Sequence, residues 1–400
     1  MSIKAVIGKN FGDEGKGLAT DYLAMLSERS GRSCIVVRHN GGAQAGHTVE
    51  IPGKRFIFHE ISSGTFRHAD TLWAPTFMPD LYKLSEEVKG LSDLGVELPK
   101  IYSVPDCPLT YIDDILINIS LESRRGRDRH GSCGMGIDEG KRRSLIPEFK
   151  ITPFDIASEG AEAFYKKLLL IRKEYLPKRL EALSLEPFSM GEYGEMIVDV
   201  NVLFNYCEQM CRNSELITIA DEGIIRTYDD VIFEGAQGLI LDEENKAFAP
   251  NLTSSRTGLT NPDAMLKSLG ISGPCEAIYV TRTYVTKHGA GRFPYEDIFL
   301  REGKCFADET NIHNEWQGSI RFAPHGSEDE FNEYVIRDSA SSVFVPSLMF
   351  THVDETGGKV LTKDGDVLLD EWISRVNREG LYKKVYVSAS HFAEDVTIIS

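Results

Sequence analysis

Residues 4–31, KAVIGKNFGDEGKGLATDYLAMLSERSG, decide the fold. They read as a short apolar strand (4–8), a glycine-rich loop (8–17) and a helix (17–31). Such a loop suits phosphate, because small residues let backbone N–H groups approach an anion and a helix N-terminus favours negative charge. Lys16 adds a cation, yet Asp13 and Glu14 place two carboxylates in the same loop.

The loop is not a Walker A motif. That motif has four residues between its first glycine and the Gly-Lys pair, followed by Ser or Thr. Here six residues separate Gly8 from Gly15, and Gly17 stands where the hydroxyl residue would be. A P-loop GTPase or a simple kinase is therefore disfavoured, although the loop remains P-loop-like.

Short apolar runs alternate with helical patterns along the rest of the chain. The apolar runs are β-branched and often lack polar alternation, which is typical of strands buried on both faces of a parallel sheet. We expect strands at residues 4–8, 33–39, 101–104, 230–236, 276–285, 347–354 and 383–389. Helical patterns cover 17–31, 81–91 and 159–183, with an interruption at Pro177, and long polar loops cover 184–195 and 308–319.

These patterns predict an α/β fold with a large, mostly parallel central sheet and surrounding helices. We expect one domain over residues 1–400, with a helical insertion at about 105–225.

Composition limits the possible partners. The formal net charge of −17 disfavours binding to nucleic acid or to an anionic membrane, so an anionic substrate needs a local group of cations and backbone amides. The seven cysteines are scattered without a CxxC pair, which favours free thiols in a reducing compartment. With no signal peptide and no apolar run of bilayer length, we expect a cytoplasmic protein, in a bacterial or host-cell cytosol if it is phage-encoded.

Two further glycine-rich segments carry chemistry-bearing residues. The segment RHNGGAQAGHT (38–48) follows a strand and ends near His47. A lone histidine is more often structural, but the end of a parallel strand is where open α/β sheets bind ligands. The segment HGSCGMGIDEGKRR (130–143) ends in a basic cluster that could equally be a solvated face.

Two strand ends supply candidates for base recognition. Gln237 ends the strand that begins at residue 230 and could contact a base edge, and Thr253 and its neighbours could hold a phosphate. Asp354 ends the strand at 347–354, where a carboxylate could accept hydrogen bonds from the N1 and 2-amino donors of guanine. An aspartate that caps a turn is the simpler explanation of the last residue taken alone.

Together these segments resemble the adenylosuccinate synthetase family, possibly its phage branch, which makes the diaminopurine precursor from dGMP. The resemblance covers most of the chain and rests on an ordered set of motifs: GDEGKG (12–17), GGAQAGHT (41–48), HEISSG (59–64), EGAQG (234–238), TSS (253–255) and GAGRFP (289–294). It implies a ligase that joins L-aspartate to the 6-oxo position of a purine mononucleotide. Hydrolysis of a nucleoside triphosphate would drive the reaction through a 6-phosphoryl intermediate.

The resemblance also explains the carboxylate in the phosphate loop. Asp13 would remove the purine N1 proton and help to hold Mg²⁺, with the carbonyl of Gly46 as a second metal ligand. His47 would act as acid at the transferring phosphoryl group, and Lys16 would contact the same phosphates. A carboxylate that binds the metal offsets its charge rather than repelling the phosphates.

The remaining site residues follow from the same resemblance. The triphosphate would contact Gly12, Glu14, Gly15, Lys16, Gly17, Gly46, Thr48, His352 and Asp354. The mononucleotide would contact Asp13, Gln44, Ser132, Cys133, Arg143, Gln237 and Thr253, with Arg143 reaching the 5′-phosphate of a neighbouring subunit in a homodimer. Aspartate would be bound by Arg321, with Asn314 and Gln317 as weaker candidates.

The choice of purine stays open between dGMP and IMP. Ser319 stands where the family has an arginine that contacts the ribose 2′-hydroxyl, which favours dGMP and the product 2-amino-2′-deoxy-N6-succinyladenylate. Asp13 argues for IMP, since members of the phage branch can have serine there.

The phosphate donor is open between GTP and ATP. Asp354 favours GTP, whereas His352 replaces the lysine that the family usually has. A non-catalytic nucleotide-binding module is the more distant alternative, and the presence of both Asp13 and His47 argues against it.

Overall fold

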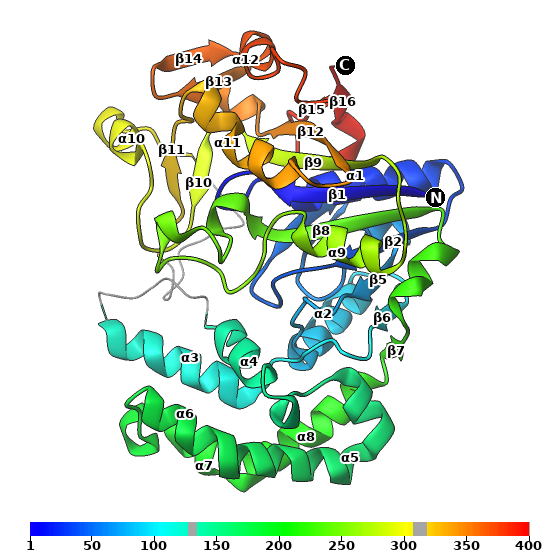
Figure 1. The fold of residues 1–400 in the computed structure, drawn as a ribbon, viewed down its shortest axis with the longest axis vertical. Coiled ribbons are helices and arrows are strands. Elements are labelled where there is room, and N and C mark those ends of the chain that lie inside the picture. Colours follow the sequence, from blue (N-terminus) through cyan, green and yellow to red (C-terminus); the bar gives the residue numbers. More distant parts are fainter. Residues whose placement is uncertain (127–133, 307–317, 400) are drawn as a thin grey trace.

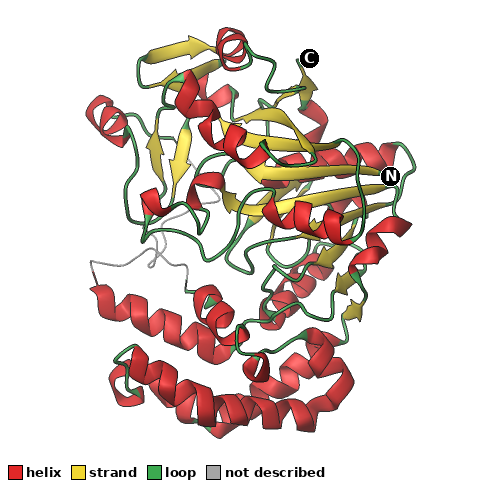
Figure 2. Ribbon diagram, in the orientation of Figure 1, coloured by secondary structure: helices red, strands yellow, loops and turns green. Residues whose placement is uncertain are grey.

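The computed structural model describes residues 1–126, 134–306 and 318–399. A central sheet of ten strands in these residues runs through the upper body (Figures 1 and 2). Its order is β16-β15-β12-β9-β1-β8-β2-β5-β6-β7, and every pair is parallel except β15 with β16. The bounds are β1 Ser2–Gly8, β2 Cys34–Arg38, β5 Asp70–Trp73, β6 Ile101–Ser103, β7 Ile217–Ile219, β8 Asp230–Gly238, β9 Cys275–Arg282, β12 Phe344–Thr351, β15 Val385–Val387 and β16 Thr397–Ile398. The predicted α/β class with a mostly parallel sheet is confirmed.

The sheet is apolar on both faces because helices cover both. In β1, Ala5 and Ile7 belong to one hydrophobic core, whereas Val6 points to a second core on the opposite face. Helix α1 (Lys16–Arg29) packs on the second face through side chains such as Leu23. The first face is covered by α2 (Leu81–Asp93), α9 (Thr260–Ser268) and α11 (Glu328–Ser339).

A helical segment joins β6 to β7 and forms the lower body in Figure 1. It contains α3 Ile112–Arg125, α4 Ile137–Ser144, α5 Pro153–Leu170, α6 Leu176–Ala182, α7 Glu192–Val198 and α8 Val200–Ser214. Pro177 does not interrupt the helical run as expected. A π-helical turn at Ile171–Tyr175 precedes it, so Pro177 lies in the first turn of α6. A missing N–H is tolerated at that position. The predicted loop at 184–195 is partly wrong, since a 3-10 turn and the start of α7 occupy it.

The predicted strand at 276–285 divides in two. Strand β9 ends at Arg282, and Val285 begins β10 (Val285–Lys287), which pairs with β11 (Arg321–Ala323) outside the main sheet. Two other hairpins, β3 (His47–Ile51) with β4 (Lys54–Phe58) and β13 (Lys359–Thr362) with β14 (Gly365–Leu368), flank the sheet. The short helices α10 (Glu296–Glu302) and α12 (Leu369–Val376) complete the upper body.

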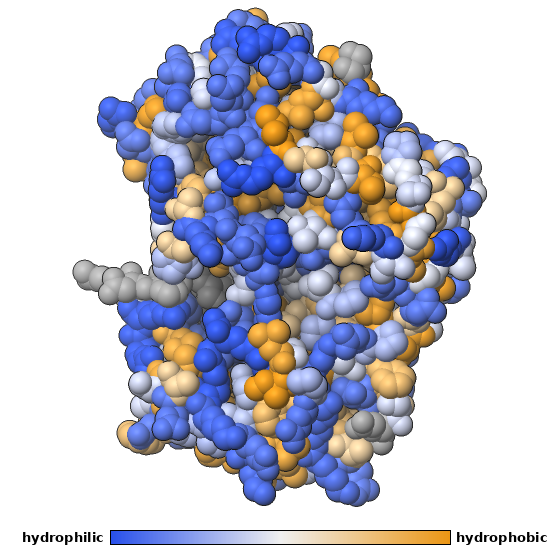
Figure 3. Space-filling view, in the orientation of Figure 1, coloured by the Kyte–Doolittle hydropathy of each residue, from blue (hydrophilic) through white to orange (hydrophobic). Residues whose placement is uncertain are grey.

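The surface agrees with the acidic composition. Hydrophilic residues cover most of the face in Figure 3, with apolar side chains in scattered groups. Among the helices of the described residues, none is both long and apolar enough to cross a membrane.

Candidate active site

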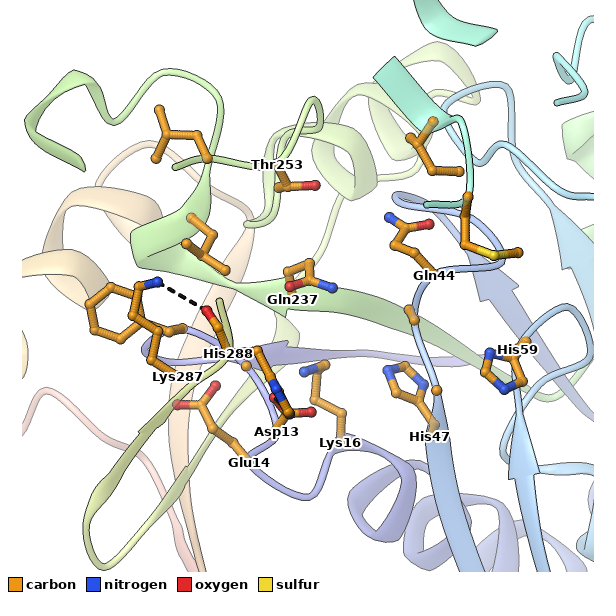
Figure 4. A pocket seen from close by; sticks show the side chains of 18 of the residues that line it. Asp13, Glu14, Lys16, Gln44, His47, His59, Gln237, Thr253, Lys287 and His288 are labelled. Carbon is orange, nitrogen blue, oxygen red and sulfur yellow. Dashed lines mark hydrogen bonds and ion pairs between the residues drawn. The ribbon is translucent and has the colours of Figure 1, made fainter. Parts of the chain in front are cut away.

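A cavity of about 1380 Å³ opens where the parallel strands end. The loops after β1, β2, β8, β9 and β12 line one side, and residues of α3 and α4 from the helical segment line the other. This is the edge at which open α/β sheets bind ligands, because the strand order there brings several loops together. Figure 4 shows Lys16 between Asp13 and His47 in this cavity.

The loop after β1 holds Asp13 in an unusual backbone conformation. Its φ of 59° is left-handed, which is uncommon for a residue with a side chain. The Asp13 carbonyl accepts a hydrogen bond of 2.6 Å from Arg282 Nε. The carboxylate stays 27% exposed in the cavity, 3.5 Å from His288 Nε2. Asp13 is thus fixed through its backbone while its carboxylate remains accessible.

Gly15 and Lys16 bring the start of α1 close to the cavity. Gly15 has a φ of 93°, and a Cβ there would lie 2.9 Å from Thr351 Cγ2, so only glycine fits. Lys16 is buried, and burial lowers the pKa of its amine against the opposing charges of Glu14 and Asp13. A buried ammonium at a helix N-terminus is suited to a phosphate that enters the cavity.

Glu14 does not face the cavity with its carboxylate. The side chain turns beneath the loop, where Oε1 accepts hydrogen bonds of 2.7 Å from the backbone N and from Nδ2 of Asn10. Burial raises its pKa to about 7. Any contact of Glu14 with a triphosphate would therefore come from its backbone.

His47 begins β3 and is anchored by buried charges. Its Nδ1 lies 2.7 Å from Glu234 Oε1, and Arg38 Nη1 lies 3.2 Å from Glu234 Oε2. Burial lowers the pKa of His47 to about 4, although the Glu234 charge opposes it. Burial opposes ionisation of Glu234, yet the charge of Arg38 and the contact with His47 lower its pKa to about 2. We infer that Nδ1–H donates to the Glu234 carboxylate, which leaves Nε2 for a ligand.

Most of the expected nucleotide residues line this one cavity. They are Gly12, Asp13, Glu14, Gly15, Lys16, Gly17, Gln44, Gly46, His47, Thr48, Gln237, Thr253, His352 and Asp354. Gln237 has a left-handed φ of 61° at the end of β8, and Figure 4 shows it above Asp13 and Lys16. Ser132, Cys133, Asn314 and Gln317 lie outside the described residues.

The structure gives Arg143 internal partners, and its contact with a 5′-phosphate stays a prediction. Its side chain is fully buried, and its guanidinium donates to Asp114 at 2.8 Å and to the carbonyls of Leu109 and Phe149 at 2.7 Å each. Arg142, one position earlier, is 55% exposed and lines the cavity.

Arg321 stays a prediction as an aspartate ligand. Its Nε donates to Glu296 Oε1 at 2.7 Å, and Nη1 donates to the carbonyls of Gly289 and Gly291 at 3.0 and 3.1 Å. The side chain is not among those that line the cavity.

Sequence reasoning assigned no role to several side chains that shape the site. Glu234 and Arg38 anchor His47, and Arg282 holds the Asp13 backbone. Lys287 lines the cavity and donates to the carbonyl of His288 at 3.0 Å, and burial lowers its pKa to about 8. Glu234 was visible as the first residue of the motif EGAQG, but its partners lie on distant segments of the chain.

The donors available for a metal are oxygen atoms. In the part of the chain that the structure describes, no three His, Cys, Asp or Glu side chains gather as a metal cage. The exposed Asp13 carboxylate and the cavity-lining Gly46 offer hard oxygen ligands. This set fits Mg²⁺, which binds one or two protein carboxylates and completes its shell with water and substrate phosphates.

Comparisons with known proteins place this site in a family context. A family model described as adenylosuccinate synthetase matches residues 5–315. The adenylosuccinate synthetase of Gloeobacter violaceus is 31% identical over 304 residues, which cover 74% of this chain and 64% of that protein. The chain therefore spans less than two thirds of the length of this relative. The enzyme of Shouchella clausii is 27% identical over 419 residues, covering 99% of this chain and 89% of that protein.

Two solved structures share the fold. The fully ligated adenylosuccinate synthetase of Plasmodium falciparum has a TM-score of 0.69 at 17% identity, covering 100% of both chains. The succinoaminodeoxyadenylate synthetase of cyanophage S-2L, bound to dGMP and dATP, has a TM-score of 0.61 at 14% identity, covering 99% of this chain and 95% of that one.

Proposed function

The chain belongs to the adenylosuccinate synthetase family, and from this premise we propose that it is a ligase that forms a C–N bond between L-aspartate and C6 of a purine mononucleotide. The observation that supports this proposal most directly is the convergence of Asp13, Lys16 and His47 in one cavity at the ends of β1 and β2 (Figure 4). A base, a phosphate-binding cation and an acid are the groups that activation of a purine 6-oxygen requires.

The first step activates the purine. Asp13 takes the N1 proton, and the resulting negative 6-oxygen attacks the γ-phosphorus of the triphosphate. The bond from that phosphorus to the β–γ bridging oxygen breaks, which releases a nucleoside diphosphate and leaves a 6-phosphoryl purine. Lys16 and the N-terminus of α1 stabilise the phosphoryl oxygens through their positive charge.

His47 contributes the acid at the same phosphoryl group. Glu234 occupies its Nδ1 side, so Nε2 is the ring nitrogen that reaches the substrate. Ligand-free His47 is neutral because burial lowers its pKa to about 4. The negative charge of bound phosphates raises that pKa, since a nearby anion favours the imidazolium, and the ring gains the proton that it donates.

The second step forms the product. The amine of aspartate attacks C6, inorganic phosphate leaves with the 6-oxygen, and the new C–N nitrogen releases one proton to the leaving phosphate or to water. Mg²⁺, held by Asp13, the Gly46 carbonyl and the phosphates, would neutralise charge on the β- and γ-phosphates. Binding and orientation by the cavity account for much of the remaining rate acceleration.

For the mononucleotide we propose dGMP, with IMP as the second candidate. Ser319 supports dGMP because a serine in place of the ribose-contacting arginine removes a donor to the 2′-hydroxyl. Asp13 supports IMP because it leaves less room for a 2-amino group than serine does. The cyanophage protein was solved with dGMP, but its likeness to this chain is one of fold.

For the donor we propose GTP. Asp354 lines the cavity at the end of β12, where its carboxylate can accept hydrogen bonds from guanine N1 and the 2-amino group. Substitution Asp354→Asn should reduce the GTP-to-ATP ratio of kcat/KM by about tenfold or more, since a hydrogen bond to a charged group contributes roughly 1.5–3 kcal/mol. An unchanged ratio would show that another group recognises the base.

One experiment tests the proposal as a whole. The purified protein is incubated with L-aspartate, Mg²⁺ and either GTP or ATP, with dGMP and IMP compared side by side, and the N6-succinyl product is measured by mass spectrometry. We expect product with both purines and a higher kcat/KM for dGMP. No product with either purine would refute the ligase assignment, and a preference for IMP would refute the choice of purine.

A further inference from the structure

We infer that Tyr284 and Arg282 are positioning residues, which act through the backbone of Asp13 and connect it to the segment that carries Asp354. This inference rests on the proposed function, because it assigns Asp13 the role of base. The two side chains are identified by their contacts in the folded structure, and neither belongs to a motif that the sequence analysis assigned to the site.

The backbone around Asp13 is held from outside its own loop. Arg282 Nε donates to the Asp13 carbonyl at 2.6 Å, and Thr286 Oγ1 donates to the Gly12 carbonyl at 2.9 Å. A left-handed φ at a residue with a side chain persists where the surrounding structure fixes it. The end of β9 and the start of β10 supply that constraint, so the direction of the Asp13 carboxylate depends on them.

Arg282 is itself fixed by Tyr284. Its Nη1 donates to Tyr284 Oη at 3.0 Å, and Tyr284 Oη donates to the carboxylate of Glu355. Arg282 is 4% exposed and Tyr284 is fully buried. The Tyr284 ring stacks on Phe306 with centroids 3.9 Å apart and planes 2° apart, which leaves the hydroxyl little freedom. These contacts form a continuous chain from Glu355 to the Asp13 backbone.

The chain ends in the segment proposed to recognise the triphosphate base. Glu355 follows Asp354 in one 3-10 turn, Asp354–Thr356, and both line the cavity. A second link runs in parallel, because Thr351 Oγ1 donates to the Glu14 carbonyl at 2.9 Å. The base-recognition segment, the end of β9 and the phosphate loop are therefore one hydrogen-bonded unit.

This arrangement has a kinetic consequence. Loss of the Tyr284 hydroxyl removes one support of Arg282 without deleting any side chain that lines the cavity. The Asp13 carboxylate then loses its fixed direction, while the other groups expected to bind the mononucleotide are unchanged. The expected effect is on kcat and not on the mononucleotide KM, because the lost interaction matters in the transition state.

The test uses the protein with the substitution Tyr284→Phe, which keeps the ring and its stacking on Phe306. We expect kcat to fall about tenfold with the mononucleotide KM unchanged within about twofold, since small misplacement of a catalytic group is costly. Tyr279→Phe is the matched control. Tyr279, which lies on β9, is also buried and donates to a carboxylate, that of Asp338 at 2.9 Å, but away from the cavity. The Tyr279→Phe variant should have a lower free energy of unfolding and an unchanged kcat.

A double substitution tests whether the two residues act in sequence. Arg282→Lys keeps a cation but cannot donate to both Asp13 and Tyr284 in the present geometry. If Arg282 transmits the effect of Tyr284, the double variant should have a kcat close to that of the less active single variant. If the two substitutions instead lowered kcat by the product of their separate effects, the proposed series of contacts would be refuted. An unchanged kcat in Tyr284→Phe would refute it as well. Absence of ligase turnover in the unsubstituted protein would instead refute the proposed function.

Discussion

Asp13 and His47 lie in the same cavity but are held in opposite ways. His47 is fixed by its side chain, which packs in a buried cluster with Glu234 and Arg38. Asp13 is fixed by its backbone, and its carboxylate stays partly exposed with a 3.5 Å contact to His288. The difference fits their proposed roles, because an acid needs one defined tautomer whereas a base that also binds metal needs accessible oxygen atoms. Four substitutions can break or sharpen this comparison.

The largest effect is expected for Asp13→Ala. Removal of the general base should lower kcat by at least about 10²–10⁴-fold, because the group proposed to take the N1 proton is lost. Mononucleotide affinity, measured by calorimetry, should change little. Turnover that survives the substitution would remove Asp13 from the proposed mechanism.

Glu234→Gln should have the next largest effect. The amide keeps the shape but loses the charge that holds His47 in one tautomer and stabilises its protonated form. We expect kcat to fall by roughly 10–100-fold, in keeping with the effect of groups that orient a catalytic histidine or a metal ligand. A double variant with His47→Asn should be no slower than His47→Asn alone, and a further loss would mean that Glu234 acts elsewhere.

His288→Asn should have a much smaller effect. The contact of His288 with Asp13 is a partly exposed pair at 3.5 Å, and such pairs contribute about 0–1 kcal/mol. We therefore expect less than about a fivefold change in kcat, the range that this energy allows. A loss as large as that of Glu234→Gln would show that Asp13, like His47, is held by its side chain.

The smallest effect concerns stability and pH. Burial lowers the pKa of His47 from 6.5 to about 4, so between these values the unfolded chain binds a proton that the folded one does not. The contribution of His47 to the free energy of unfolding should therefore fall as the pH is lowered from 6.5 to 4. In denaturant titrations of the ligand-free protein, His47→Asn should remove this contribution, so the variant should lose less stability, or gain more, over this pH range than the unsubstituted protein. The residual slope has two opposing parts. His39 and His325, whose pKa values burial lowers to about 3, lose stability as the pH falls. Glu14 and Glu87, whose pKa values burial raises to about 7, gain it.

Strands and helices with a strong local signal were predictable from the sequence. The run at residues 4–8 and the helix after it appear as β1 and α1, because apolar periodicity and a glycine before the helix act over a few residues. The three-residue strand β7 and the short β5 were not predicted, since so few residues carry little pattern. They form only because neighbouring strands offer hydrogen-bonding partners.

In the candidate site, too, local features were predictable from the sequence and long-range contacts were not. Glycine-rich turns that follow apolar runs mark Asp13, Lys16 and His47 as candidates from local sequence alone. Glu234 is 187 residues from His47 in the sequence, and Arg282 is 269 residues from Asp13. No local pattern reports a contact over such separations. The internal ion pair of Arg143 was not predictable for the same reason, because its partner Asp114 belongs to another helix.

The sequence by itself therefore determined the alternation of strands and helices, the glycine turns and the kinds of side chain that these turns carry. Only the tertiary structure decided how those side chains are held. The sheet inserts β8 between β1 and β2, which sets Glu234 beside Arg38 in register and within reach of His47. The physical reason is that burial and ion pairing depend on which strands become neighbours, and that choice depends on packing of the whole chain.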